Sequence, residues 1–400
     1  MAGTADLPLE MRRNGLNPTE ELAQVRDRDG VIPVGELYGA PAFLVCRYED
    51  VRRIFADSNR FSNAHTPMFA IPSGGDDVIE DELAAMRAGN LIGLDPPDHT
   101  RLRHILAAEF SVHRLSRLQP RIDEIVDSAL DGLEQAGQPA DLMDRYALPV
   151  SLLVLCELLG VPYADRDELR DRTARLLDLS ASAEQRAVAQ REDRRYMATL
   201  VTRAQEQPGD DLLGILARKI GDNLSTDELI SIISLIMLGG HETTASMIGL
   251  SVLALLHHPE QAAMMIEDPN CVDSGIEELL RWLSVAHSQP PRMAVTEVQI
   301  AGVTIPAGSF VIPSLLAANR DSNLTDRPDD LDITRGVAGH LAFGHGVHFC
   351  LGHSLARMTL RTAVPAVLRR FPDLALSPSH DVRLRSASIV LGLEELQLTW

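Results

Sequence analysis

Lysine, cysteine and aromatic residues are scarce in this sequence. Lys219 is the single lysine among 37 basic residues, and 57 acidic residues leave a formal charge of −20. A surface of that sign repels the phosphates of nucleic acids and anionic lipids. We therefore expect no nucleic acid and no membrane as partner, although a local basic docking patch is compatible with this charge. The 45% of hydrophobic residues can bury a large core, which predicts a globular protein.

The cysteines are too few and too far apart for a disulfide scaffold or a CxxC metal site. They stand at Cys46, Cys156, Cys271 and Cys350. This usage is typical of a reducing cytoplasm. The amino-terminal stretch MAGTADLPLEMRRNG has no long apolar run, so we expect neither a signal peptide nor a membrane anchor. The sequence therefore predicts a cytoplasmic protein.

No internal repeat or low-complexity block divides the 400 residues, so we expect one domain over residues 1–400. Between Asp98 and Leu256 apolar residues recur every three or four positions, which predicts helices. Apolar runs broken by Gly and Pro in residues 31–51 predict strands, and the segment from Val298 predicts two short strands around a turn. The expected fold class is mainly α with small β-sheets.

One helix is expected to be longer than the others. Ser225 and Glu228 form a capping box (Ser-x-x-Glu) ahead of a long apolar run, and Pro259 ends that run. At about 1.5 Å per residue, this helix spans on the order of 45 Å. Its length suits a membrane span, but residues 239–244 place glycines, a histidine, a glutamate and threonines in its middle. We therefore favour a central buried helix of a soluble fold.

The segment HLAFGHGVHFCLGHSLARMTL is the most informative in the chain. Gly344, Gly346 and Gly352 surround Cys350, and a helical pattern begins directly after it. Glycines permit positive φ angles and a close approach to a flat cofactor, and the N–H groups at a helix start stabilise a thiolate. A single thiolate without neighbouring Cys or suitably spaced His residues cannot complete a tetrahedral zinc site. It can, however, be the one protein ligand of a haem iron.

This loop resembles that of the cytochromes P-450, which reads Phe-x-x-Gly-x-His/Arg-x-Cys-x-Gly. The matching residues are Phe343, Gly346, His348, Cys350 and Gly352. The resemblance implies that Cys350 is the metal ligand, bound to the iron of haem b (iron protoporphyrin IX), and that Phe343 and Gly344 contact this cofactor. A buried free cysteine in a Gly-rich turn is the alternative interpretation, and the number of matched positions weighs against it.

Residues 239–244, Gly-Gly-His-Glu-Thr-Thr, interrupt the apolar pattern of the long helix. Each helical glycine costs about 1 kcal/mol relative to alanine, which suggests a compensating role. Gly239 and Gly240 would leave room for dioxygen above a haem, and a threonine bonded to a helical carbonyl would loosen the helix for water. The stretch is similar to the family motif Ala/Gly-Gly-x-Asp/Glu-Thr, which implies that Glu242 and Thr243 are catalytic and manage proton delivery. A helix kink with a satisfied threonine and an ion-paired glutamate is the alternative.

Haem carries two propionates, which need Arg or His donors in so acidic a protein. His99 and Arg103 lie four residues apart and so share one helical face. By the resemblance these two residues, Arg292 and His348 bind the cofactor, although each alone could be an ordinary surface base. Arg101, between the helical pair, is expected to face outward.

Glu278 and Arg281 share a helix face at i,i+3 in IEELLRWL. An exposed pair at this spacing is common and contributes only about 0.2–0.5 kcal/mol. These two residues resemble the family's Glu-x-x-Arg motif, which implies a structural tie beneath the haem and no catalytic role.

The resemblance covers nearly the whole chain and implies a triangular, mostly helical fold with small β-sheets. It also implies NAD(P)H-driven insertion of one oxygen atom, by hydroxylation or epoxidation, into a lipophilic small molecule of secondary metabolism, such as an antibiotic pathway. The sequence contains no Gly-rich flavin or nicotinamide fingerprint after a strand and no cysteine quartet for an iron–sulfur cluster. We therefore expect electrons from a separate ferredoxin and ferredoxin reductase, and we expect a monomer.

Two other functions stay open. A haem-thiolate peroxygenase would use hydrogen peroxide directly, but that branch generally lacks the acid–threonine pair. A non-catalytic haem sensor or recruiting partner would not need Glu242 and Thr243. A mixed apolar and polar lining suggests a lipophilic, partly oxygenated substrate, and we expect this lining from residues 68–71, 235–238, 286–289 and 388–391.

Overall fold

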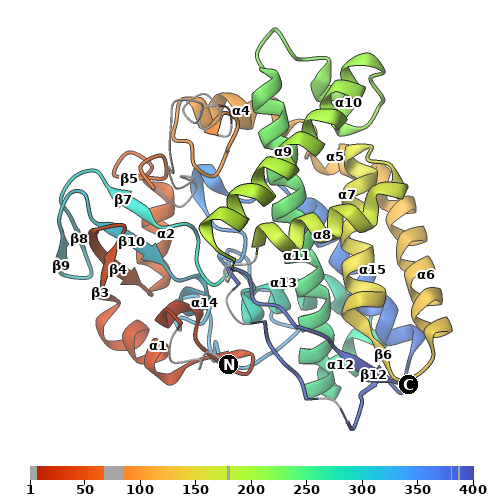
Figure 1. Cartoon of the computed structure of the whole chain (residues 1–400). Coiled ribbons are helices and arrows are strands. Elements are labelled where there is room, and N and C mark those ends of the chain that lie inside the picture. The colour runs from red at the N-terminus through yellow and green to blue at the C-terminus, as the bar shows by residue number, and fades with distance from the viewer. Residues whose placement is uncertain (1–6, 67–84, 86, 178–180, 380, 386–387) are drawn as a thin grey trace.

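The computed structural model describes residues 7–66, 85, 87–177, 181–379, 381–385 and 388–400. Helices dominate this part of the chain and the strands form small sheets, so the predicted class is confirmed (Figure 1). The longer helices are α2 (Tyr48–Ala56), α4 (Asp98–Ala107), α6 (Gln119–Ala136), α7 (Leu148–Leu159), α8 (Arg166–Leu177), α9 (Ala183–Glu206), α11 (Thr226–His257), α12 (Pro259–Glu267), α13 (Cys271–Leu283) and α15 (His353–Arg370). The shorter ones are α1 (Glu20–Gln24), α5 (Val112–Leu115), α10 (Leu212–Ala217) and α14 (Leu315–Ala318).

The strands belong to four small sheets. One sheet has five strands: β3 (Val31–Leu37), β4 (Ala40–Val45), β10 (Phe310–Pro313), β7 (Arg292–Ala294) and β5 (Phe61–Ser62), in that order. One has three strands: β11 (Ala375–Leu376), β12 (Gln397–Thr399) and β6 (Ala140–Asp141). The remaining pairs are β1 (Arg13–Asn14) with β2 (Asn17–Pro18), and β8 (Val298–Ile300) with β9 (Val303–Ile305).

Helix α11 crosses the middle of the helical region (Figure 1). It begins at the predicted capping box, where the Glu228 N–H donates to Ser225 Oγ at 3.1 Å and the Ser225 N–H donates to Glu228 Oε2 at 2.8 Å. Within the described residues, α11 is the one helix long and apolar enough to cross a membrane, and half of its most apolar stretch is buried inside the protein. Helices α7, α9 and α15 pack against it, which explains its apolar composition.

The five-stranded sheet positions Arg292. Strand β10 is parallel to β4 and antiparallel to β7, and Val311 of β10 lies opposite Arg292 of β7. The two short strands predicted around a turn from Val298 are β8 and β9, but the prediction missed a third strand in the same segment, β10. A turn after β9 separates β10 from the β8–β9 hairpin, so β10 joins the larger sheet instead.

Two apolar cores meet at the cysteine loop, which we define as residues 341–352. The larger core fills the space among α6, α7, α11, α13 and α15, and Phe343 packs against it. The smaller core lies between α2 and the five-stranded sheet, and it includes Leu341. The loop is therefore held between a helical body and a sheet, each of which presents side chains to it.

Candidate functional site

Cys350 lies three residues before the first residue of α15, His353. Its N–H donates to Phe343 O at 2.9 Å, and the Phe349 N–H donates to Gly346 O at 3.0 Å, so backbone hydrogen bonds close the loop. Helix α15 then begins at His353 and runs for 18 residues. The thiol therefore stands beside the N-terminal N–H groups of a long helix, where partial positive charge gathers.

Two glycines of the loop adopt conformations that other residues rarely take. Gly344 and Gly346 have φ angles of 71° and 72°. A Cβ at Gly346 would stand 2.1 Å from the backbone oxygen of Phe55, so α2 leaves no space for a side chain there. At Gly344 the nearest atom to a Cβ would be the side chain of Gln289 at 3.5 Å, so only the backbone angle requires glycine. The loop therefore approaches α2 closely.

The Cys350 thiol is surrounded by groups that act on it in opposite directions. Burial raises its pKa, while backbone N–H groups of Gly352 and His353 and the charges of Arg103 and Arg357 lower it. Burial favours the uncharged thiol. The N–H donors and the two arginines favour the thiolate anion. Such a site suits a sulfur whose negative charge is shared with a bound metal ion.

The structure brings together the four predicted cofactor donors. His99 and Arg103 project from α4, Arg292 from β7, and His348 from the turn at Gly346–His348. The rings of His99 and His348 have centroids 4.3 Å apart. Arg103 Nη2 donates to the backbone oxygen of Phe349, next to Cys350, at 2.6 Å. All four predicted donors therefore converge on the side of the cysteine loop that faces α4 and β7.

Within the described residues these donors form no ion pair, although the charge of Asp95 acts on His99 and Arg292, and Arg292 Nη1 donates to Ile54 O at 3.0 Å. His99 and Arg292 are 2% and 1% exposed, yet His99 Nδ1, Arg292 Nε and His348 Nε2 are buried without hydrogen bonds within the described residues. Burial lowers the pKa of Arg292 to about 10. Burial and the nearby charges of Arg292, His99 and Arg103 lower that of His348 to about 3. Unsatisfied buried donors are costly, so the cluster suits an anionic ligand, and two propionates would satisfy it.

The two glycines and the threonine predicted on α11 lie in different surroundings. A Cβ at Gly239 would meet no atom of the described residues within 4 Å, so among these residues this position opens onto free space. A Cβ at Gly240 would stand 2.9 Å from the Leu155 side chain, so the prediction that Gly240 also leaves room for dioxygen is wrong: this glycine packs against α7. Thr243 Oγ1 donates to Gly239 O at 2.6 Å, which is the helical back-bond expected of a threonine that loosens a helix.

Glu242 is buried beside an arginine that the sequence did not single out. Glu242 is 4% exposed, and Arg385 Nη1 donates to its Oε2 at 2.6 Å. Next to it on the helix, His241 is fully buried, and burial lowers its pKa to about 4. Glu242 is thus bound to Arg385, whereas Thr243 is bound to the carbonyl oxygen of Gly239. The sequence contains little that would indicate Arg385. It is one of two arginines two residues apart near the carboxyl end, and it lies outside every motif named above.

Glu278 and Arg281 form a fully buried pair. Arg281 Nε and Nη2 donate to the two carboxylate oxygens at 2.7 and 2.8 Å, and both side chains are 0% exposed. Arg281 Nη1 also donates to the carbonyl oxygens of Asn319 and Pro328, each at 2.8 Å. The pair ties α13 to the segment that leads to the cysteine loop, so the predicted structural tie is confirmed.

A second carboxylate on α13, Glu277, binds residues on both sides of the cysteine loop, and no sequence motif indicated it. Arg357 Nε and Nη2 donate to its two oxygens at 2.7 Å each, and His340 Nε2 lies 3.1 Å from Oε2. The Arg357 guanidinium stacks over the Phe343 ring, with 4.5 Å from Cζ to the ring centroid. Glu277 thereby links α13 to His340, which precedes the cysteine loop, and to Arg357 of α15, which follows it.

Glu277 is expected to stabilise the fold only above acidic pH. Burial alone would raise its pKa, but His340 and Arg357 lower it from 4.5 to about 2. A carboxylate whose pKa is depressed in the folded state adds stability above its unfolded pKa and loses it as pH falls toward the folded value. Glu277→Gln should therefore lower the free energy of unfolding by about 2 kcal/mol near pH 7, a value reduced for the partial exposure of the side chain. Near pH 3 the loss should be much smaller.

Urea unfolding of the wild type and of Glu277→Gln between pH 7 and pH 3 measures the difference in their free energies of unfolding. The exposed Glu260 of α12 offers a matched control, because Glu260→Gln removes a carboxylate without that network. A Glu277→Gln penalty that stays constant across the pH range would contradict the assignment.

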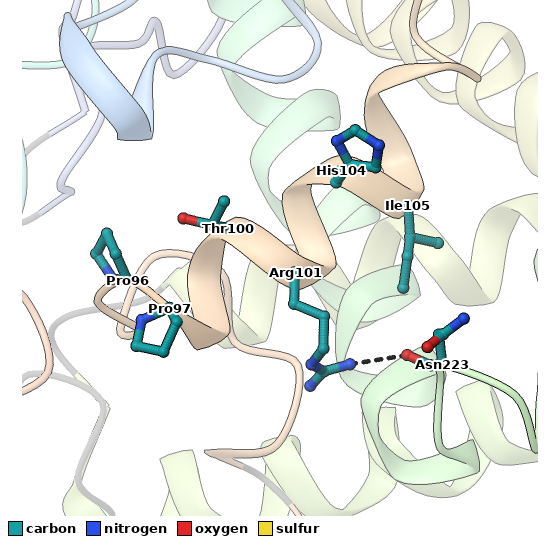
Figure 2. A pocket seen from close by; sticks show the side chains of 7 residues that line it. All are labelled: Pro96, Pro97, Thr100, Arg101, His104, Ile105 and Asn223. Atoms are coloured by element: carbon teal, nitrogen blue, oxygen red, sulfur yellow. Dashed lines mark hydrogen bonds between the residues drawn. The ribbon is translucent and has the colours of Figure 1, made fainter.

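A surface pocket lies along α4 (Figure 2). Its volume is about 750 Å³, and its lining is Pro96, Pro97, Thr100, Arg101, His104, Ile105 and Asn223. Arg101 donates to Asn223 O at 2.8 Å and pairs with Glu228, so its predicted outward position is confirmed. This pocket contains none of the predicted site residues.

Other predicted features can be placed only in part. Residues 286–289 and 388–391 lie side by side, because Ala286 bridges Val390 and the Leu391 N–H donates to Val285 O at 2.7 Å. Residues 68–71 lie outside the described part of the chain. No group of three or more His, Cys, Asp or Glu side chains able to hold a metal ion occurs in the described residues.

Comparison with known proteins gives concordant matches. A family model described as cytochrome P-450 matches residues 170–400. The chain is 99% identical over 400 residues, all of both proteins, to the cytochrome P-450 FAS1 of Rhodococcoides fascians. It is 40% identical over 391 residues to a vitamin D(3) 25-hydroxylase of Pseudonocardia autotrophica, covering 96% of this chain and 94% of that one. The solved P-450 StaH, from biosynthesis of a glycopeptide antibiotic, has 38% identity and a TM-score of 0.87 over 98% of this chain and 100% of that one.

Proposed function

This chain belongs to the cytochrome P-450 family and has its fold, as the sequence predicted, and from that membership we propose its reaction and its site. It is a monooxygenase of that family. We propose that it transfers one atom of dioxygen, by hydroxylation or epoxidation, to a lipophilic small molecule of secondary metabolism. Two relatives support this class, since one is named a vitamin D(3) 25-hydroxylase and another comes from antibiotic biosynthesis.

The observation that carries the proposed site is the set of unpaired buried donors beside Cys350. The family's cofactor is haem, whose thiolate-ligated iron activates dioxygen. Cys350 would hold the iron, and His99, Arg103, Arg292 and His348 would bind the propionates. This would remove the cost of leaving His99 Nδ1, Arg292 Nε and His348 Nε2 without hydrogen bonds. Haem b is the form that needs these contacts and no covalent attachment.

Three small or flat groups would border the cofactor. Gly239 opens onto free space and would leave room for dioxygen on the side of α11. Phe343 is stacked beneath the Arg357 guanidinium and joins the Cys350 N–H through its carbonyl, which fixes the loop. Gly344, at a positive φ, lets the loop turn without a side chain toward Gln289. These features support all three residues as cofactor contacts.

Glu242 and Thr243 would manage the protons of the reaction. Monooxygenation joins substrate, one dioxygen, two electrons and two protons to give the oxygenated product and one water. A hydroxyl backed by a carboxylate and water can pass protons in sequence. Thr243 Oγ1 donates to the carbonyl oxygen of Gly239, the position that opens onto space, and Glu242 lies on the same stretch of α11.

The electrons would come from NAD(P)H through a ferredoxin and its reductase. Within the sequence no motif for a flavin, a nicotinamide or an iron–sulfur cluster was found, so a separate supply is needed. We further propose a single domain over residues 1–400, a monomer, and a place in the cytoplasm without nucleic-acid or membrane partners. The charge of −20 supports the absence of nucleic-acid and membrane partners.

A peroxygenase remains the second candidate function. It would need no proton relay from Glu242 and Thr243, and both residues are present with defined partners. The same observation weighs against a non-catalytic haem sensor or recruiting partner. Oxygenation supported by peroxide and not by a ferredoxin system would favour the peroxygenase.

The proposed cofactor site is tested by reconstitution. Purified chain incubated with hemin is expected to bind one haem per chain, and the dithionite-reduced carbon monoxide complex should show the red-shifted Soret band of a thiolate-ligated iron. Absorbance titration measures the stoichiometry, and the reduced difference spectrum measures the band. Protein that stays colourless, or that gives a band typical of histidine ligation, would refute the site.

A further inference from the structure

Arg385 connects Glu242 to the carboxyl-terminal hairpin, by which we mean the antiparallel pairing of residues 383–385 with residues 392–394. Its Nη1 donates to Glu242 Oε2 at 2.6 Å, and its Nη2 donates at 3.1 Å to Oγ of Ser246, one turn further along α11. Ser246 is fully buried and the Glu242 side chain is 5% exposed. One guanidinium thus spans two positions of the helix face that also contains Gly239 and Thr243.

The hairpin holds this guanidinium in place. The Arg385 N–H donates to Gly392 O at 2.8 Å, and Leu384 bridges Leu393 in antiparallel register. The hairpin is itself anchored, because the Leu391 N–H donates to Val285 O at 2.7 Å. The backbone that carries Arg385 is therefore fixed independently of its ion pair with Glu242.

Gly392 provides the space in which the guanidinium lies. A Cβ at this glycine would stand 2.3 Å from Arg385 Nη2, 2.6 Å from Nε and 2.8 Å from Cζ. The conflict would be with the end of a flexible side chain, so the arginine could move aside while the backbone stays. Alanine at residue 392 would therefore push the guanidinium away from Glu242 without altering either charged group.

We propose that Arg385 is a positioning residue for proton delivery: it holds the Glu242 carboxylate in the orientation from which protons reach Thr243, and Gly392 keeps the space for it. A carboxylate so buried is costly without a cation, so loss of Arg385 would change where Glu242 points. The bidentate reach to Glu242 and Ser246 needs the planar fork of arginine. This inference rests on the proposed function, since it presumes that Glu242 and Thr243 manage protons.

The reaction without substrate offers a measurable consequence. Complete reduction joins one dioxygen with four electrons and four protons to give two waters, whereas incomplete reduction uses two electrons and two protons and releases hydrogen peroxide. Slower proton delivery favours the second route. The ratio of peroxide formed to dioxygen consumed therefore reports on Glu242 without knowledge of the substrate.

The test compares Arg385→Gln, Arg385→Lys and Gly392→Ala, all in haem-loaded protein reduced by NADPH through a surrogate ferredoxin and reductase. Arg385→Gln and Gly392→Ala should slow the proton-dependent step on the order of tenfold, less than the 10²-fold or more expected for loss of a proton donor itself. Peroxide per dioxygen should rise, and the solvent deuterium isotope effect should change. Arg385→Lys should lie between, because it keeps the charge and loses the fork.

Matched controls separate position from general disturbance. Arg383 lies two residues earlier with a side chain 69% exposed, so Arg383→Gln should behave like wild type. Gly132 is an exposed helical glycine with open space around its Cβ position, so Gly132→Ala controls for the added methyl group. A crystal structure of Gly392→Ala should show Arg385 Nη1 beyond hydrogen-bond reach of Glu242.

The outcomes distinguish the two levels of inference. Wild-type protein without the red-shifted carbon monoxide band would refute the proposed function itself. If that band is present and Arg385→Gln and Gly392→Ala release peroxide as wild type does, the positioning role is overturned and the ion pair is structural. A rise in peroxide with unchanged haem content and melting temperature supports the positioning role.

Discussion

A Cys350→Ala variant is expected to lose the red-shifted Soret band of the reduced carbon monoxide complex. The band reports a thiolate opposite the carbon monoxide, and alanine leaves no ligand at that place. The cysteine loop should persist, because backbone groups make its hydrogen bond from Cys350 to Phe343 and its turns. Haem content should fall less than the band, since His99, Arg292 and His348 would still offer unpaired nitrogen atoms to the propionates. A pyridine haemochromogen assay and a difference spectrum measure the two quantities.

Cys271→Ala provides the control for this loss. Cys271 begins α13, is partly exposed, and contacts the Asp268 carboxylate at 3.6 Å. Removing its sulfur should leave both haem content and spectrum unchanged. If Cys350→Ala kept the red-shifted band, another group would have to ligate the iron, and the assignment of Cys350 would be wrong.

Short-range signals in the sequence predicted most of the fold that surrounds the site. The capping box at Ser225 and Glu228 depends on residues three apart, and it marks the start of α11 where the structure has it. The strands in residues 31–45 follow the same local logic. Long-range pairing was not predictable in this way: β10 lies parallel to β4, more than 260 residues earlier, and nothing near residues 310–313 indicates that partner.

The candidate site shows the same division. Residue type and spacing pointed to Cys350 and to Glu278 and Arg281 as an i,i+3 pair, and the structure confirms this ion pair. Residue type alone did not say which way a glycine faces, so Gly240 was assigned to the open side although it packs on Leu155. Arg385 could not be found from the sequence, because it meets Glu242 across 143 residues. Only the folded chain brings them together.

Thr243→Ala is expected to divert reducing equivalents to hydrogen peroxide while haem stays bound. The threonine hydroxyl, bonded to Gly239 O at 2.6 Å, is the polar group of α11 beside the position that opens onto free space. Without it, the second proton of each cycle arrives more slowly, by on the order of 10²-fold if the hydroxyl acts as a positioned donor. Peroxide formed per dioxygen consumed should therefore approach one, and a peroxide assay alongside an oxygen electrode measures this ratio.

Two further variants test whether the hydroxyl itself is responsible. Thr243→Ser keeps the hydroxyl and should stay close to wild type, whereas Thr244→Ala removes the neighbouring hydroxyl and should change the ratio little. Helix stability does not explain such a pattern, because alanine is the better helix former and Thr243→Ala should not lower the melting temperature appreciably. Normal coupling in Thr243→Ala, with the red-shifted carbon monoxide band intact, would show that protons reach dioxygen by a route that does not use this residue.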